Sequence, residues 1–144
     1  MLFLHLFSSL ASDILLLATA TASLFYLRQN YCLKTQKKII SLPSIQALDN
    51  WILRLLISAF ALMSLGIVAG SILAYQQWGR YWYLDPRQIW SVVNWFVFAV
   101  VLLTRFLVGW RGPRAVWVTL SGVTLMMLGF LMLHYFSWSQ HHGF

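Results

Sequence analysis

Acidic residues and cysteine are the scarcest residues of this sequence. Its 144 residues include three acids, Asp13, Asp49 and Asp85, and one cysteine, Cys32; charged residues make up 9% of the chain and hydrophobic residues 60%. A soluble domain usually carries about 25% charged residues, so this chain cannot cover a water-facing surface. A single cysteine excludes a disulfide framework and paired-cysteine metal or redox motifs.

Four long apolar runs take the place of the missing charge. They cover residues 4–27, 51–75, 89–108 and 115–138. About 20 apolar residues in a helix cross the ~30 Å hydrocarbon core of a bilayer, and a lipid-embedded segment must satisfy its own backbone polar groups. The sequence therefore predicts an all-α integral membrane protein: one transmembrane domain over residues 1–144, folded as a four-helix bundle.

The formal charge of +7 is unevenly distributed over the three connections. Eight basic residues crowd the first and third connections or lie beside them, and two lie in the second; in chain order the eight are Arg28, Lys34, Lys37, Lys38, Arg54, Arg105, Arg111 and Arg114, and the two are Arg80 and Arg87. Because basic connections stay in the cytoplasm, both termini and the second connection are expected on the outer side. Membrane orientation thus explains the charge, and no nucleic-acid partner is expected.

Local signals mark the helix ends. Leu42-Pro43-Ser44 and Asp49 fit the start of the second helix, with Asp49 as a cap near its N-terminus. Gly109 and Gly112-Pro113 fit a turn between the third and fourth helices. Gly66 and Gly70 form a GxxxG spacing that permits close helix packing, although this spacing is common in membrane helices.

The second connection, residues 78–90, is unusually aromatic. It reads WGRYWYLDPRQIW and contains Trp78, Trp82 and Trp90, with Trp95 just beyond it. Such an array suits a large planar apolar ligand, and Arg80 and Arg87 could pair with the carboxylates of that ligand. The alternative is an aromatic belt at the membrane interface.

Histidines are expected on the same side as this loop. His5 begins the first apolar run, and His141 and His142 follow the last one. Imidazole is a usual axial ligand of haem iron, so two histidines flanking an aromatic platform fit a bis-histidine site. His142 is a reserve for His141, because adjacent residues cannot both point at one iron. The alternative is that these are interfacial polar residues.

The loop and its surroundings resemble the cytochrome c assembly family, the CcsA/HemX-type membrane proteins that handle haem. The loop is similar to the family's tryptophan-rich "WWD" signature, and the flanking segments also match: Leu42-Pro43-Ser44, Leu48-Asp49, Leu65-Gly66-Ile67, Gly70, Gly109-Trp110-Arg111-Gly112 and Arg114-Ala115. The resemblance covers nearly the whole chain and corresponds to the C-terminal half of longer members.

The resemblance implies a haem-binding protein of cytochrome c biogenesis. It implies His5 and His141 as axial ligands of one non-covalent haem b at the outer face, and Trp78, Trp82, Asp85 and Trp90 as parts of the loop that faces the haem. Apocytochrome c and other membrane subunits would be its partners. The location would be an inner, plasma or thylakoid membrane, with residues 78–90 on the periplasmic or lumenal side.

The sequence also departs from the family pattern. Leu84 and Gln88 stand where the family has Trp and Glu in the loop, and about Leu103 stands where it has the histidine of an inner haem site. The chain is therefore expected to act at most as part of a haem lyase complex and not as an enzyme alone. Two alternatives remain: a small subunit of a membrane electron-transfer complex, and a HemX-like regulator of haem synthesis.

Two polar residues fall inside the apolar runs. Asp13 is ~12 Å deeper than His5, and His134 is ~10.5 Å deeper than His141, at 1.5 Å per helical residue. An intramembrane acid is costly and normally finds a partner, so these two side chains are expected to approach each other or a shared water. Alternatively, Asp13 reaches the interface or pairs with another subunit. Met126, Met127 and Met132 are expected to be packing residues.

Overall fold

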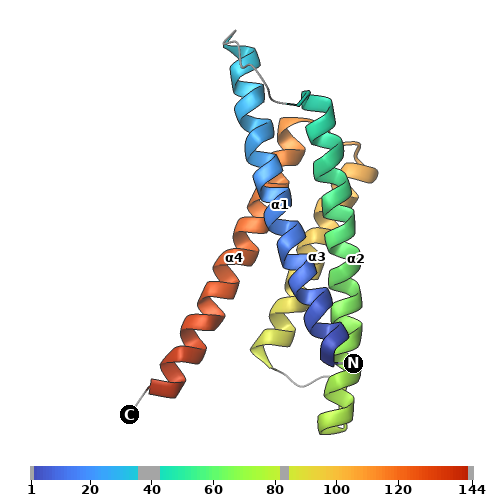
Figure 1. Ribbon diagram of the computed structural model, residues 1–144, viewed down its shortest axis with the longest axis vertical. Coiled ribbons are helices and arrows are strands. Elements are labelled where there is room, and N and C mark those ends of the chain that lie inside the picture. Colours follow the sequence, from blue (N-terminus) through green and yellow to red (C-terminus); the bar gives the residue numbers. More distant parts are fainter. Residues whose placement is uncertain (1, 36–42, 82–84, 143–144) are drawn as a thin grey trace.

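The protein is a bundle of four long helices, as the apolar runs predict. The computed structural model describes residues 2–35, 43–81 and 85–142, with side chains in the last helix described as far as residue 135. The helices are α1 (Leu2–Lys34), α2 (Ile45–Trp78), α3 (Pro86–Phe106) and α4 (Pro113–His142) (Figure 1). All four are long and apolar enough to cross a membrane. The described residues contain no strand, which confirms the all-α class.

The helices extend beyond the apolar runs because their ends are fixed by caps rather than by hydropathy. The Ser44 hydroxyl accepts a hydrogen bond from the Ala47 N–H at 3.2 Å and caps α2. Asp85 caps α3, which has Pro86 at its first position, the arrangement typical of helix starts. The prediction that Asp49 caps α2 is wrong, because α2 already begins at Ile45 and Asp49 lies inside it.

The helices form a closed ring of contacts. α1 packs along α2, α4 contacts α1 and α3, and α3 contacts α2. We call the end with the α1–α2 and α3–α4 connections the basic end, and the end where α2 meets α3 the aromatic end. At the aromatic end α4 leans away from the other helices (Figure 1).

The apolar core fills the middle of the bundle and the half nearer the basic end. All four helices contribute to the middle, with Leu16, Leu56, Phe98 and Val123 buried together. A second cluster, of Tyr26 on α1, Leu48 and Ile52 on α2 and Val116 on α4, continues toward the basic end. Neither cluster reaches the aromatic end, so the side chains there are left to line a cavity.

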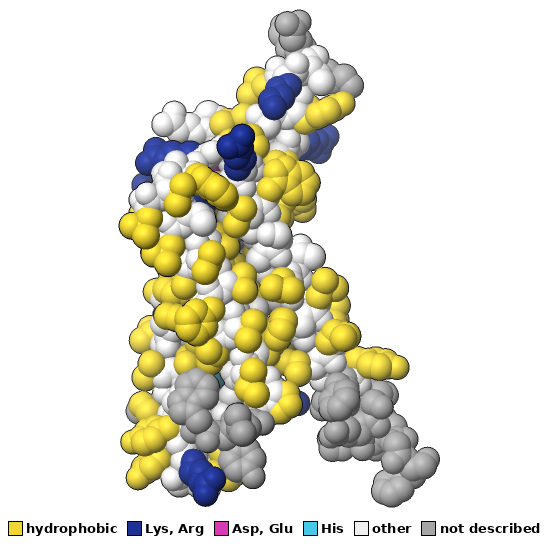
Figure 2. Space-filling view, turned by 180° about the vertical axis from the view of Figure 1, so that it is seen from behind, with side chains coloured by type: hydrophobic (Ala, Val, Ile, Leu, Met, Phe, Trp, Pro, Cys, Tyr) yellow, Lys and Arg dark blue, Asp and Glu magenta, His cyan; other side chains and the backbone are white. Residues whose placement is uncertain are grey.

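The outer surface has the composition that a bilayer requires. Large hydrophobic side chains are exposed along every helix, and they cover the visible flank of the bundle (Figure 2). Lys and Arg side chains gather near the basic end in the same view. In water this apolar surface would be unstable, whereas in lipid it costs nothing. The protein is therefore an integral membrane protein.

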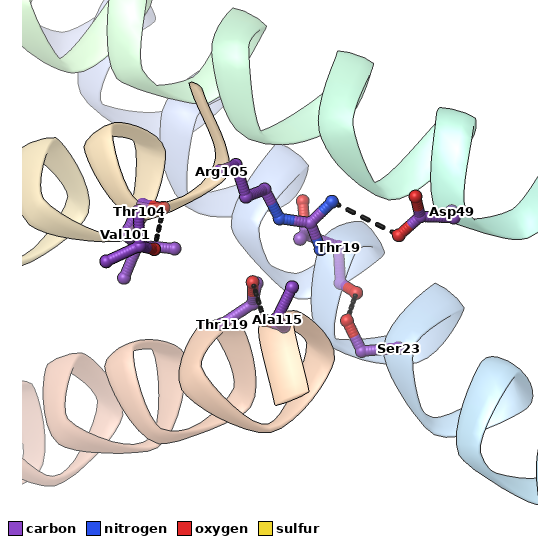
Figure 3. Close-up of polar contacts among 8 residues, drawn as sticks. All are labelled: Thr19, Ser23, Asp49, Val101, Thr104, Arg105, Ala115 and Thr119. Carbon is purple, nitrogen blue, oxygen red and sulfur yellow. Dashed lines mark hydrogen bonds and ion pairs between the residues drawn. The ribbon is translucent and has the colours of Figure 1, made fainter. Parts of the chain in front are cut away.

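A buried ion pair joins α2 and α3 in the basic half. Arg105 Nη1 lies 3.2 Å from Asp49 Oδ1, and the two side chains are 4% and 17% exposed. Figure 3 shows the Arg105 side chain extending from α3 toward Asp49 of α2. Arg105 was counted with the basic connections, but it lies inside α3 and its charge is balanced within the bundle.

Candidate functional site

A cavity of about 610 Å³ occupies the half of the bundle that the core leaves open. Every helix contributes to its wall, from His5 and Asp13 on α1 to His134 on α4. Ligand pockets in proteins usually measure about 300–1,000 Å³, so this space can take a drug-sized or cofactor-sized molecule. Several of the site residues predicted from the sequence line this cavity.

His5 lines the cavity and is held in one orientation by α2. Its Nδ1–H donates a hydrogen bond to the Gly66 carbonyl oxygen at 2.8 Å. A carbonyl can only accept, so Nδ1 carries the proton, and in a neutral imidazole Nε2 is then a free acceptor. Metal-binding histidines are usually oriented by such a bond from the other ring nitrogen. The hydrogen bond thus leaves Nε2 of His5 without a partner among the described residues, and its role as a metal ligand stays a prediction.

The GxxxG pair of α2 lies against this part of α1. A Cβ at Gly70 would be 2.9 Å from His5 Cε1 and 3.1 Å from Nδ1, closer than side chains pack. A Cβ at Gly66 would meet the Ser8 hydroxyl at 3.1 Å. The close approach that the spacing permits therefore has a specific use: Gly70 leaves the space that the imidazole occupies.

Trp90 forms another part of the wall. A Cβ at Gly129 of α4 would overlap its indole, so the ring lies directly on the backbone of that helix. The buried Nε1–H of Trp90 has no hydrogen-bond partner among the described residues, and the residue lines the cavity. A buried donor without a partner usually indicates a missing water or ligand.

The remaining residues of the aromatic loop divide into two groups. Trp78, Asp85, Arg87 and Gln88 line the cavity, whereas Arg80 is exposed and lies outside its lining. Asp85 Oδ1 also accepts a hydrogen bond from the Arg87 N–H at 3.2 Å. Trp82 and Leu84 lie outside the described residues.

Trp95 does not belong to this wall. Its Nε1–H donates to the Ser64 hydroxyl at 2.8 Å, and its ring stacks on Phe60 with centroids 5.3 Å apart. Trp95 was counted with the aromatic residues that could face a ligand, but its indole packs α3 against α2.

Polar groups lie at the inner end of the cavity, where the sequence predicted Asp13 and His134. Asn94 is 7% exposed, and its Oδ1 accepts no hydrogen bond within the described part of the chain. It follows Trp90 by one helical turn and therefore shares its face of α3. Ser9 and Asp13 follow His5 at the same four-residue spacing on α1 and line the cavity opposite. The four-residue spacing of these side chains on α1 and on α3 was the sequence signal that could have identified them as cavity residues.

His134 is in the cavity wall with His5 and Asp13. No hydrogen bond or ion pair joins Asp13 and His134 in the described part of the chain, so the expectation that they approach each other or a shared water stays a prediction. His141 and His142 belong to the last turn of α4, whose side chains lie outside the described residues. The axial role of His141 therefore stays a prediction.

Leu103 stands at the position where the resemblance places the histidine of an inner haem site. Leu103 is 50% exposed on the outside of the bundle. The described residues also contain no cluster of three or more His, Cys, Asp or Glu side chains that could bind a metal ion.

The described structure is that of a membrane protein: four membrane-spanning helices surround a cavity that has aromatic side chains and an oriented histidine in its wall. Residues 1–141 match the family described as cytochrome C assembly protein. The chain belongs to this family.

Individual relatives agree with the family. The chain is 33% identical over 125 residues to the cytochrome c biogenesis protein CcsA of Heterosigma akashiwo, covering 86% of this chain and 39% of the relative. It is 38% identical over 103 residues to CcsA of Gloeobacter violaceus, covering 65% and 30%, and 36% identical over 104 residues to CcsA of Marchantia polymorpha, covering 65% and 32%. The match spans roughly a third of each relative's length. No solved structure matches the chain.

Proposed function

We propose that the protein binds one haem, held non-covalently, in the cavity at the aromatic end and serves in cytochrome c biogenesis. The observation that carries the proposal is the hydrogen bond from His5 Nδ1–H to the Gly66 carbonyl, which leaves Nε2 free in the wall of a cavity of about 610 Å³. Family membership supports the choice of haem over another planar ligand.

The residues of the wall fit such a group. Trp78 and Trp90 offer flat apolar faces, and Arg87 offers a guanidinium to a carboxylate, a pairing that guanidinium geometry favours. A bound haem would supply an iron that takes imidazole ligands and two vinyl groups that can react with thiols. The chain's own residues would orient it and shield it from water.

Sidedness follows from charge. The seven basic residues that remain in or beside the connections of the basic end, without the paired Arg105, still exceed the two near the aromatic loop. The positive-inside rule then assigns the cavity to the outer side. Haem held there could be passed to an apocytochrome c or stay within a complex with other membrane subunits.

Haem spectra of the purified protein test the proposal. Expressed with ample haem, the wild type should show a sharp reduced α-band, and His5→Ala should lower the haem content per protein roughly tenfold or more, since an axial ligand is lost. Leu6→Ala is the matched control, because Leu6 is exposed on the same turn. A colourless wild type, or equal haem in both variants, would contradict the proposal.

A fixed electron-transfer haem is the second candidate function. The exposed Leu103 favours it, because the chain offers no histidine at the inner position that the resemblance assigns to haem passage. Incubating the haem-loaded protein with a reduced CxxCH peptide separates the two functions. Covalent haem transfer to the peptide supports biogenesis, and tight retention of the haem supports electron transfer.

A further inference from the structure

A second, smaller cavity lies at the basic end of the bundle. It measures about 60 Å³ and lies between the start of α2 and the end of α3 with the connection that follows. One water needs about 10–15 Å³ of such space, so this cavity can hold a group of several heavy atoms. Its lining consists of the polar or charged residues Asp49, Asn50, Arg105 and Arg111 and the largely apolar residues Leu53, Phe106 and Trp110.

The small cavity has an excess of positive charge. Two arginines and one aspartate line it, and Asp49 is already paired with Arg105 at 3.2 Å. Arg111 is exposed and forms no ion pair within the described part of the chain. An anion that enters this cavity would therefore meet one guanidinium whose charge is not compensated.

Arg105 also has hydrogen-bonding capacity that the ion pair does not use. Its Nη1 donates to Asp49 Oδ1, whereas Nε and Nη2 are buried and have no partner among the described residues. Nε–H and one N–H of Nη2 lie on the same edge of the planar guanidinium, and such an edge binds two oxygens of one phosphate or carboxylate. Buried donors without a partner usually indicate a missing water or ion. Two parallel donors favour an oxyanion.

The surroundings of the small cavity have the character of a membrane interface. Phe106, Leu107 and Val108 are exposed at the end of α3, just before Trp110 of the lining. Tryptophan favours the boundary between headgroups and acyl chains, and basic pockets between membrane helices bind anionic headgroups. The phosphate of a lipid could reach the arginines while its acyl chains lie along the exposed apolar side chains. A free phosphate ion would make no use of this apolar surface, so a lipid fits better.

We propose that the small cavity binds the phosphate of an anionic phospholipid from the leaflet at the basic end. Arg105 and Arg111 bind the phosphate oxygens, and the Asn50 amide donates a further hydrogen bond. Asp49 holds the Arg105 guanidinium through Nη1 and leaves its Nε–Nη2 edge for the phosphate. No residue of this lining belongs to the cavity at the aromatic end, so the inference does not depend on the proposed haem function.

Native mass spectrometry of the purified chain in mild detergent tests this inference. The protein is mixed with equal amounts of dioleoyl phosphatidylglycerol and dioleoyl phosphatidylcholine, which have the same acyl chains. The wild type should retain several-fold more phosphatidylglycerol as a one-to-one adduct, because the choline ammonium would face the Arg111 guanidinium. Equal retention of the two lipids would overturn the proposal.

Two variants separate this site from general attraction to the basic end. Arg111→Gln should lower the retention of phosphatidylglycerol several-fold; Arg111 is chosen because replacing Arg105 would also break the ion pair with Asp49. Arg114→Gln is the matched control and should bind like the wild type, since Arg114 is exposed at the same end but does not line the cavity. Equal losses in the two variants would show diffuse attraction and overturn the proposed site.

Two further measurements examine the cavity and the identity of the ligand. Asn50→Leu keeps the net charge but removes a hydrogen-bond donor from the cavity, so it should also weaken retention of phosphatidylglycerol. Unchanged retention would overturn the placement of the phosphate in this cavity. Preincubation of the wild type with millimolar inorganic phosphate should leave the lipid adduct intact, whereas displacement of the lipid would identify a free phosphate ion as the ligand and overturn the lipid assignment.

Discussion

His5 illustrates how single residues prepare this site. A histidine near the end of a membrane helix has many rotamers and two tautomers, but here the Gly66 carbonyl selects the Nδ1-protonated form and Gly70 supplies the space for the ring. Orientation before binding reduces the entropy that a ligand would otherwise have to overcome. The orientation and tautomer of the His5 imidazole are therefore set by Gly66 and Gly70 of the neighbouring helix.

Gly70→Ala should weaken haem binding without unfolding the protein. The new Cβ would be 2.9 Å from the imidazole, and disturbing the support of a metal ligand typically costs 10–100-fold in affinity. Alanine is a better helix former than glycine by about 1 kcal/mol, so a weaker helix would not be the cause. Haem titration followed by absorbance measures the effect.

Gly66→Ala is the control for this experiment. It makes the same chemical change one turn away, where the added Cβ meets serine hydroxyls at 3.1 and 3.3 Å instead of the ring. Serine side chains can rotate, and the carbonyl that binds His5 remains. A loss of affinity equal to that of Gly70→Ala would show that helix spacing, not the imidazole, is responsible.

At the scale of helices, α4 packs against α3 through the contact of Trp90 with Gly129. Gly129→Ala should separate them, because the Cβ would overlap the indole, and overpacking typically costs about 1–3 kcal/mol. Gly122→Ala is the matched control on the same helix, since its Cβ would make an ordinary contact of 3.4 Å with Val97. Unfolding in mixed micelles should show a lower free energy of unfolding for Gly129→Ala and no change for Gly122→Ala. Equal stability of the two variants would contradict the packing of Trp90 on Gly129.

The ion pair between Asp49 and Arg105 fixes α2 against α3. Removing one partner of a buried pair leaves an uncompensated charge, at a cost of about 3–5 kcal/mol. Asp49→Asn should be more harmful than Arg105→Met, because the remaining guanidinium is 4% exposed and the remaining carboxylate 17%.

The double variant Asp49→Asn/Arg105→Met separates this electrostatic account from simple packing. With both charges gone, most of the lost unfolding free energy should return. Unfolding by denaturing detergent measures all three variants. Losses that add up in the double variant would show that the two residues stabilise the bundle independently.

At the scale of the whole molecule, a packed half and an open half follow one another along the membrane normal. The core clusters take the half nearer the basic end, and the cavity takes the aromatic half. This division gives close packing to the basic end and leaves open space at the aromatic end, where we propose that the ligand binds. It also makes the orientation of the bundle decisive for function.

Cysteine labelling tests that orientation. In a Cys32→Ser background, Arg80→Cys should react with a membrane-impermeant maleimide added to the outside of intact cells, because residue 80 is exposed and belongs to the less basic end. Arg111→Cys should react only after the membrane is permeabilised. Labelling in the opposite order would place the cavity on the cytoplasmic side.

Much of the fold could be predicted because hydropathy and helix length are local properties. The four apolar runs predicted four helices, and every one is present. Trp95 was misjudged because its bond to Ser64 joins two residues that are distant in the sequence, and the ion pair of Asp49 with Arg105 could not be predicted for the same reason. The error on the α2 cap was different, because the bond between Ser44 and Ala47 is local. A short-range pattern contains no information on residues that are 31 or 56 positions apart.

The sequence by itself determined the membrane class, the four helices and the family, because a bilayer imposes length, hydropathy and charge rules on each segment separately. Only the tertiary structure decided that His5 is oriented by Gly66, that Trp90 rests on Gly129 and that His134 belongs to the same cavity. These relations depend on the rotation and tilt of each helix, which are set by side-chain packing among all four helices at once.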